Sequence, residues 1–142
     1  MALTLNGIAQ GFIADKVAVL LRGRGLDHVL VDTGEFRAIG PMPDGSAWPV
    51  GLASGGQVQL TSGGLASSSA LGTCFDAAGR VGHILDPRTG LPAPPRWHLV
   101  TITAPSAALA DGLSTAACLM DSAGQITAAI GAFAGAELAH LA

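Results

Sequence analysis

Aromatic residues are nearly missing from this sequence, whose 142 residues include four Phe, two Trp and no Tyr. Hydrophobic residues nevertheless make up 49% of the chain, which excludes a disordered protein. Much of that fraction is Ala, so we expect a core of small aliphatic side chains that pack closely. A chain of this length is expected to form a single domain, residues 1–142, with its own core.

Charge is scarce as well. Charged residues make up 12% of the sequence, seven of them are Lys or Arg, and the net charge is −3. A protein that binds nucleic acid or an anionic membrane would show clustered basic residues, and here they are scattered. No stretch approaches the ~20 apolar residues of a membrane span, and no signal peptide is visible.

Cysteine is limited to Cys74 and Cys118. Neither belongs to a CxxC pair or has a His neighbour at metal-ligand spacing, which argues against a zinc site. Two buried thiols are the expectation, because free Cys is usually buried. The sequence leaves a disulfide between them open.

The apolar pattern predicts an α+β fold, with a helix first, several short strands next and helices last. The first helix is expected over residues 5–24, with Asn6 as its N-cap. Its apolar stripe would consist of Ile8, Phe12, Val19 and Leu20. Short strands are expected at residues 28–31, 36–39, 48–52, 57–60, 65–68 and 99–103. Ser106 is expected to cap a helix that runs to about residue 120, and a last helix is expected over residues 126–141.

The first of three motifs is Leu5-Asn-Gly-Ile-Ala-Gln-Gly-Phe12. Gly7 and Gly11 are four residues apart, so on a helix they lie on one face. They would bare the backbone near a helix N-terminus, where N–H groups and the helix dipole favour phosphate. Glycines at this spacing serve close packing as often, and the spacing alone does not choose between the two.

The second motif is Gly82-His-Ile-Leu-Asp-Pro-Arg-Thr-Gly90. His83 carries an imidazole, the side chain that can take or give a proton near neutrality. The rigid turn that begins at Asp86 would hold it in place. The alternative is a structural turn in which His83 bonds a backbone carbonyl, and for a lone His this is the commoner state.

The third motif is Ala104-Pro-Ser-Ala-Ala-Leu-Ala-Asp-Gly-Leu-Ser-Thr-Ala116. On a helix, Asp111 and Thr115 share one side at i and i+4, with Ser114 at its margin. A carboxylate and a hydroxyl placed in this way can share a hard cation such as Mg²⁺. The alternative is a solvated polar face, although the rest of this helix is almost uncharged.

These motifs, in this order and together with Val-Asp-Thr-Gly-Glu at residues 31–35, resemble the ApbE family of FAD:protein FMN transferases over about residues 3–120. The resemblance implies an ApbE-like, T-fold-related mixture of helices and antiparallel sheet. It corresponds to the C-terminal half of the usual family fold, without the N-terminal half. It also implies Mg²⁺-dependent transfer of FMN from FAD to a Thr or Ser hydroxyl of an acceptor protein, with release of AMP. The alternatives are a non-catalytic FAD- or nucleotide-binding module and an inactive fragment.

The same resemblance assigns roles to single residues. The matching positions for Mg²⁺ are Asp111 and Thr115, the backbone carbonyl of Gly7 (with Ala9 as the alternative) and Ser114 in the metal's surroundings. His83 would be the base for the acceptor hydroxyl. Thr4, Gln10 and Ile84 match positions that contact FAD.

Two positions depart from the usual pattern. Gln10 stands where many relatives have Lys, and Thr4 where Asp is common. The resemblance further implies an acceptor subunit of a membrane redox complex, action on the periplasmic side of the cell envelope, and a partner chain or a second copy that completes the site.

Overall fold

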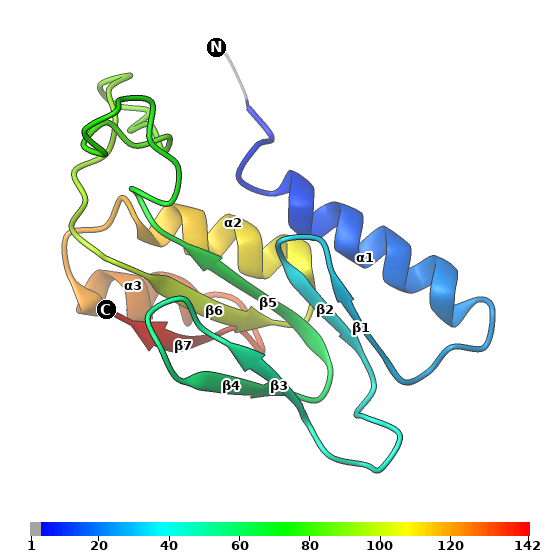
Figure 1. The fold of residues 1–142 in the computed structure, drawn as a ribbon. Helices are drawn as coiled ribbons and strands as arrows, with labels where there is room; N and C mark the ends of the chain where they lie inside the picture. The colour runs from blue at the N-terminus through cyan, green and yellow to red at the C-terminus, as the bar shows by residue number, and fades with distance from the viewer. Residues whose placement is uncertain (1–3) are drawn as a thin grey trace.

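The computed structural model describes residues 4–142. They form three layers, with helices on one face of a five-stranded sheet and a β-hairpin on the other (Figure 1). The large sheet has the order β1-β2-β5-β6-β7, and every neighbouring pair in it is antiparallel. The helices are α1 (Ala9–Arg22), α2 (Ala107–Ala117) and α3 (Ala123–Ile130). The strands of the large sheet are β1 (Val29–Asp32), β2 (Phe36–Ile39), β5 (Gly63–Ser68), β6 (Val100–Ala104) and β7 (Glu137–Leu141). The hairpin consists of β3 (Trp48–Gly51) and β4 (Gln57–Leu60). The predicted α+β class with an antiparallel sheet is therefore confirmed.

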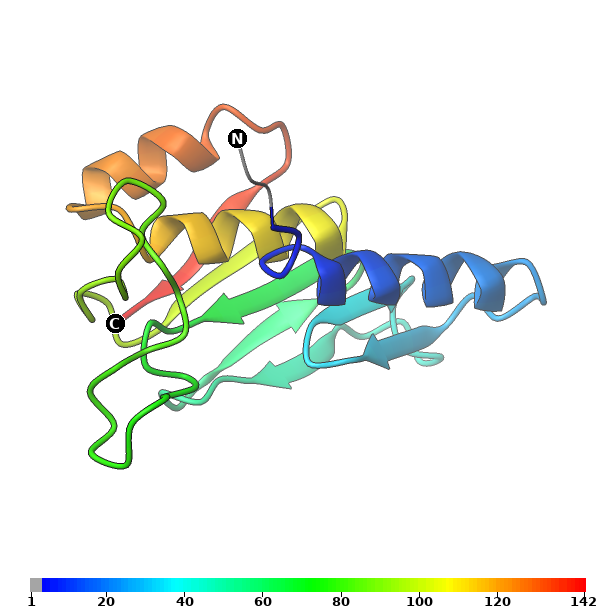
Figure 2. The same ribbon diagram turned by 90° about the horizontal axis from the view of Figure 1, so that it is seen from above.

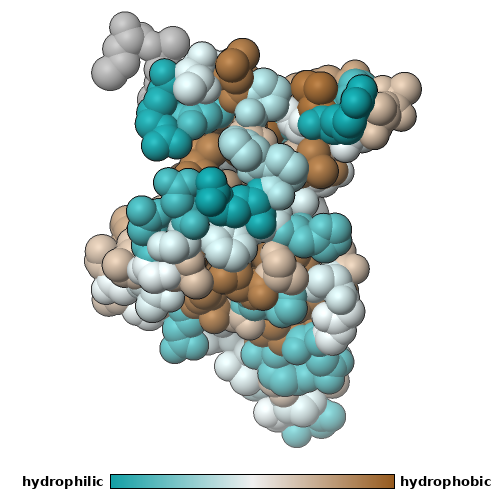
Figure 3. All heavy atoms as spheres, turned by 90° about the vertical axis from the view of Figure 1, so that its left-hand side faces the viewer, coloured by the Kyte–Doolittle hydropathy of each residue, from teal (hydrophilic) through white to brown (hydrophobic). Residues whose placement is uncertain are grey.

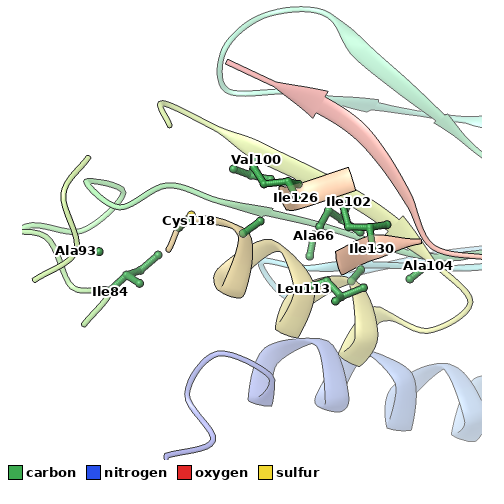
Figure 4. Packing of buried hydrophobic residues seen from close by; sticks show 12 residues of the cluster. Ala66, Ile84, Ala93, Val100, Ile102, Ala104, Leu113, Cys118, Ile126 and Ile130 are labelled. Carbon is green, nitrogen blue, oxygen red and sulfur yellow. The ribbon is translucent and has the colours of Figure 1, made fainter. Parts of the chain in front are cut away.

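The main core lies between the sheet and the helices α2 and α3. Strand β6, between β5 and β7, is rich in β-branched residues, which favour strands, and Val100, Thr101 and Ile102 are fully buried. Ile126 and Ile130 of α3 pack on the same cluster, as Figure 4 shows. The opposite face of the sheet buries Ala38 and Leu65 against the hairpin. Each face of the sheet is thus covered, and the edge of β6 is occupied by β7.

Helix α1 buries a different face from the one predicted. Phe12 is 52% exposed and Leu20 is 71% exposed, and Ile8 and Val19 of the same stripe are exposed too. The buried residues of α1 are Gly11, Ala14 and Ala18. Because α1 packs closely on α2, only small side chains fit between them, and the larger apolar residues point outward.

The predicted start of α1 is also wrong. The helix begins at Ala9 with Ile8 as its N-cap, no side chain caps it, and Asn6 lies in the preceding turn. For α2 the prediction is confirmed, since Ser106 is the N-cap and its Oγ accepts a hydrogen bond from the Leu109 N–H at 3.2 Å.

The last helix of the prediction is wrong over its second half. Helix α3 ends at Ile130, and residues 137–141 form β7, which pairs with β6. Gly131 caps α3, and Gly135 turns the chain with a φ of +76°, a backbone region that favours glycine. Exposed Glu137 and Ala139 then alternate with partly buried Leu138 and His140, which is the period of a strand.

Residues 69–99 form a long projecting segment between β5 and β6, drawn in green at the upper left of Figure 1. Its regular pairing is limited to isolated bridges, Cys74 with Gly82 and Leu85 with Pro92. Both cysteines are free, with Cys118 buried and Cys74 half-buried. Within the described residues, no helix has the length and apolar character needed to cross a membrane.

Candidate functional site

Helices α1 and α2 lie side by side and antiparallel over the sheet (Figure 2). Contacts at three successive positions along α1 show that the two helices run in opposite directions. A Cβ added to Gly7 would lie 2.9 Å from the Thr115 side chain, and one added to Gly11 would lie 2.3 Å from the Ala107 carbonyl oxygen. One turn further along α1, the Asp15 carboxylate accepts a hydrogen bond from the Ala107 N–H at 3.0 Å. The glycines therefore serve close packing, and they bring the start of α1 onto the polar side of α2.

Asp111 lies at the middle level of this junction and is 4% exposed. Its Oδ2 accepts a hydrogen bond from the Gly11 N–H at 3.0 Å. In a regular helix that N–H would bond the carbonyl four residues earlier, which belongs to Gly7. The start of α1 thus gives its amide to the buried carboxylate, and the Gly7 carbonyl keeps no such bond. Burial raises the pKa of Asp111, and the Gly11 N–H partly offsets the shift.

Hydroxyl groups line the next turn of α2. The Ser68 Oγ on β5 lies 2.7 Å from the Ser114 Oγ and 3.3 Å from the Thr115 Oγ1. The Ser114 Oγ donates to the Asp111 backbone carbonyl at 3.1 Å and is fully buried. Ser114 therefore ties α2 to β5, whereas Thr115 is only partly buried and faces Gly7. The structure brings together Gly7, Asp111, Ser114 and Thr115, and their binding of Mg²⁺ stays a prediction.

A second buried carboxylate stands near Asp111, and the sequence reasoning missed it. Glu35 is 7% exposed, and its Oε2 is buried without a hydrogen-bond partner among the described residues. Burial raises the pKa of Glu35 to about 8, and the negative charges of Asp111 and Asp32 add to the shift, while a backbone hydrogen bond from Ser67 opposes it. In the sequence, Glu35 belongs to the family motif at residues 31–35, which assigns it no role. A carboxylate directly before a buried strand was the signal that could have found it.

The two carboxylates have no basic partner in the described part of the chain. None of the ion pairs formed within residues 4–142 includes Glu35 or Asp111. That part of the chain also holds no cluster of three or more His, Cys, Asp and Glu side chains placed for a metal ion. A cation at this junction would instead meet carboxylate, hydroxyl and carbonyl oxygens, which are the ligands that Mg²⁺ prefers.

His83 lies in the projecting segment and is exposed. Its Nδ1 is 3.1 Å from the Thr73 carbonyl oxygen. Because a carbonyl only accepts, Nδ1 must carry the proton, and in the neutral ring Nε2 then holds a free electron pair. One ring nitrogen of His83, Nδ1, is therefore bonded to a backbone carbonyl, as expected for a structural histidine. The other nitrogen, Nε2, remains available.

The residues matched to FAD contacts are spread out. The Gln10 Nε2 donates to the Thr33 carbonyl at 3.5 Å, beside the turn that leads to Glu35. The exposed Thr4 accepts from the Asn6 N–H at 3.4 Å. The Ile84 side chain is 8% exposed and belongs to the main core, near the end of α2 (Figure 4). For all three, FAD contact stays a prediction.

Comparison with known proteins shows the family of this chain. A sequence model described as "ApbE family" matches residues 1–132. The chain belongs to the ApbE family. It is 34% identical over 122 residues to a protein of Haemophilus influenzae named FAD:protein FMN transferase, covering 78% of this chain and 35% of the relative. It is 37% identical over 134 residues to a protein of that name from Treponema pallidum, covering 82% of this chain and 37% of the relative.

Solved ApbE structures share the fold. The crystal structure of the ApbE protein from Thermotoga maritima superposes with a TM-score of 0.84 at 32% identity, over 96% of this chain and 47% of that one. An H257G variant of the flavin transferase ApbE from Vibrio cholerae gives a TM-score of 0.71 at 29% identity, over 92% of this chain and 41% of that one. This chain therefore spans about a third of the curated relatives and less than half of these solved chains.

Proposed function

We propose that this chain carries the cation and phosphate part of an FMN-transfer site, which moves FMN from FAD to a Ser or Thr hydroxyl of an acceptor protein and releases AMP. The observation that carries the proposal is the junction of α1 and α2, where buried Asp111 accepts the Gly11 N–H and Thr115 lies against Gly7. Relatives named FAD:protein FMN transferase support the reaction class.

The donor set at this junction suits a Mg²⁺ ion. Asp111 and Thr115 would hold it, with the Gly7 carbonyl that lacks its helical partner, while Ser114 fixes the turn between them. The Oε2 of Glu35, buried without a hydrogen-bond donor among residues 4–142, is a further oxygen beside this junction that a cation could satisfy. When bound, such an ion polarises phosphoryl oxygens and neutralises charge that develops in phosphoryl transfer.

The remaining steps belong to the side chains. The acceptor hydroxyl oxygen forms a bond to the phosphorus of the FMN half of FAD, and the bond from that phosphorus to the bridging oxygen breaks, so that AMP leaves with the electron pair. His83 takes the hydroxyl proton at Nε2, because its Nδ1–H is held by the Thr73 carbonyl. A positioned base of this kind contributes about 10²–10⁴-fold in rate. Thr4, Gln10 and Ile84 are assigned to FAD by the resemblance.

The surroundings of His83 suit a protein substrate. Figure 3 looks at the end of the molecule from which the projecting segment rises, and shows hydrophobic and hydrophilic atoms mixed on it. Exposed apolar side chains of this segment are Leu71, Phe75, Val81, Leu85 and Leu91. We assign the acceptor, on the family resemblance, to membrane redox complexes on the periplasmic side of the cell envelope.

The test is incubation of the chain with FAD, Mg²⁺ and an acceptor protein that carries a Ser/Thr flavinylation motif. In-gel flavin fluorescence of the acceptor and release of AMP, both lost with EDTA, are the expected results. His83→Ala is expected to retain FAD binding and to slow labelling by at least about 10²-fold. Full transfer by that variant would overturn the role of His83. Tight FAD binding without labelling would favour the binding module, and no FAD binding would favour the inactive fragment.

A further inference from the structure

Glu35 lies on the same face of the sheet as the proposed cation site. Successive residues of a strand point to opposite faces. On β2, Arg37 pairs with Asp15 of α1 at 3.0 Å, and Ile39 packs in the cluster beneath α1. Glu35 continues this series by two residues and therefore also faces the helices.

Glu35 and Asp111 lie beside the same part of helix α1. Two residues of a strand advance about 6.6 Å, and one turn of a helix advances about 5.4 Å. If Arg37 is opposite Asp15, Glu35 is therefore opposite the region of Gly11, whose N–H donates to Asp111. The contact of Gln10 with the Thr33 carbonyl ties the start of α1 to the same turn.

Two buried carboxyl groups close to each other form an environment that favours a bound cation. A buried charge is costly unless it is paired. Glu35 and Asp111 are 7% and 4% exposed, they repel each other, and no Lys or Arg among residues 4–142 pairs with either. The buried Glu35 Oε2 has no donor within the described part of the chain. A divalent cation beside Asp111 would compensate both charges at once.

We propose that Glu35 is a cation-binding residue of this site and supplies its second negative charge. The inference rests on the proposed function, because it takes the cation to be the one held by Asp111 and Thr115. It adds Glu35, which directly precedes β2, to a site that the motifs assign to α2 and the turn before α1. A charge at this position would raise the affinity for the ion, whether the carboxylate meets it directly or through water.

The test measures metal binding without flavin or acceptor. The chain is titrated with Mn²⁺ as a probe for divalent cations, and the free ion is followed by electron paramagnetic resonance. Glu35→Gln keeps the shape of the side chain and removes its charge, and we expect it to weaken Mn²⁺ binding about 10–100-fold, the range seen when partners of metal ligands are lost. Glu35→Asp keeps the charge and is expected to recover part of the affinity. Glu137→Gln, the same change at an exposed position of β7, is the matched control and should bind like the wild type.

Asp111→Asn separates this inference from the proposed function. If Asp111→Asn loses Mn²⁺ and Glu35→Gln binds as tightly as the wild type, the role of Glu35 is overturned and the cation site stands. If the wild type itself binds no Mn²⁺, the cation site fails, and the role of Glu35 with it. Thermal unfolding in EDTA controls for folding. Glu35→Gln is expected to unfold no earlier than the wild type, because it removes a buried carboxyl group whose Oε2 has no hydrogen-bond donor among residues 4–142. An early loss of structure would show a structural role instead.

Discussion

At the scale of single residues, the site is defined by polar groups buried among very small side chains. The carboxylate of Asp111 is buried and accepts one hydrogen bond, from the backbone N–H of Gly11. The carboxyl group of Glu35 is also buried, and its Oε2 has no hydrogen-bond partner among residues 4–142. A stable core would pair such groups or replace them. The lack of a basic partner for them among residues 4–142 supports the proposed function. The cost of burying them should appear in the stability of the metal-free chain.

Burial of Glu35 should make the stability of the metal-free chain depend on pH. The pKa of Glu35 is raised from 4.5 to about 8 in the folded chain, chiefly by burial. Between these values the folded state holds a proton that the unfolded state has lost, so stability falls as pH rises through this window and levels off above it. The raised pKa of Asp111 acts in the same direction. Melting temperatures in EDTA from pH 5.5 to 8.5 should decrease for the wild type and for Glu137→Gln, and change less for Glu35→Gln. Equal slopes for all three proteins would contradict the assignment.

At the scale of elements, the packing of α1 on α2 builds the site. The close approach at Gly11 allows its N–H to reach Asp111, and the Asp15 carboxylate, 3.0 Å from the Ala107 nitrogen, holds the first turn of α2. The same approach explains why the apolar stripe of α1 is exposed. The position of one helix relative to the other therefore sets the distances within the site.

A methyl group at Gly11 should separate the two helices. The added Cβ of Gly11→Ala would lie 2.3 Å from the Ala107 carbonyl oxygen, which belongs to the backbone and cannot rotate away. We expect a loss of about 1–3 kcal/mol of unfolding free energy, as for other overpacked positions, and weaker Mn²⁺ binding. Gly23→Ala is the control, because its φ is −63° and its nearest neighbour would be 3.4 Å away. Chemical denaturation checks both variants, and equal stability would refute the packing argument.

The elements also show how far the sequence could predict the fold. Strands at residues 36–39 and 57–60 and the cap at Ser106 were found, because alternation, turn residues and capping are local signals. The strand at residues 137–141 was predicted as helix, since Ala-rich segments suit a helix locally and only the open edge of β6 made it a strand.

The site was predicted in part for the same reason. Asp111 and Thr115 are one helical turn apart, so their proximity follows from sequence spacing alone. Ser68 belongs to β5 and Glu35 directly precedes β2. Their nearness to α2 depends on the order of the sheet, which no local pattern shows. The family motif placed His83, but its Nδ1 contact with Thr73 required the structure.

At the scale of the whole molecule, the chain spans about a third of its curated relatives, covering 35% and 37% of two of them. It nevertheless matches 96% of its own length to the ApbE fold from Thermotoga maritima. In the proposed function, the cation and phosphate side of the chemistry would lie within residues 4–142. We propose, on the family resemblance, that a second copy or a partner chain encloses the flavin.

The most direct test of the central claim is FMN attachment to an acceptor protein, measured with wild-type chain and with Asp111→Asn over a range of Mg²⁺ concentrations. Intact-mass measurement of the acceptor detects the covalent flavin, and thermal unfolding confirms that both proteins are folded. The account predicts attachment by the wild type that rises with Mg²⁺ and disappears in EDTA, and no attachment by Asp111→Asn at any concentration. Attachment by Asp111→Asn at the wild-type rate, or wild-type attachment that persists in EDTA, would contradict it.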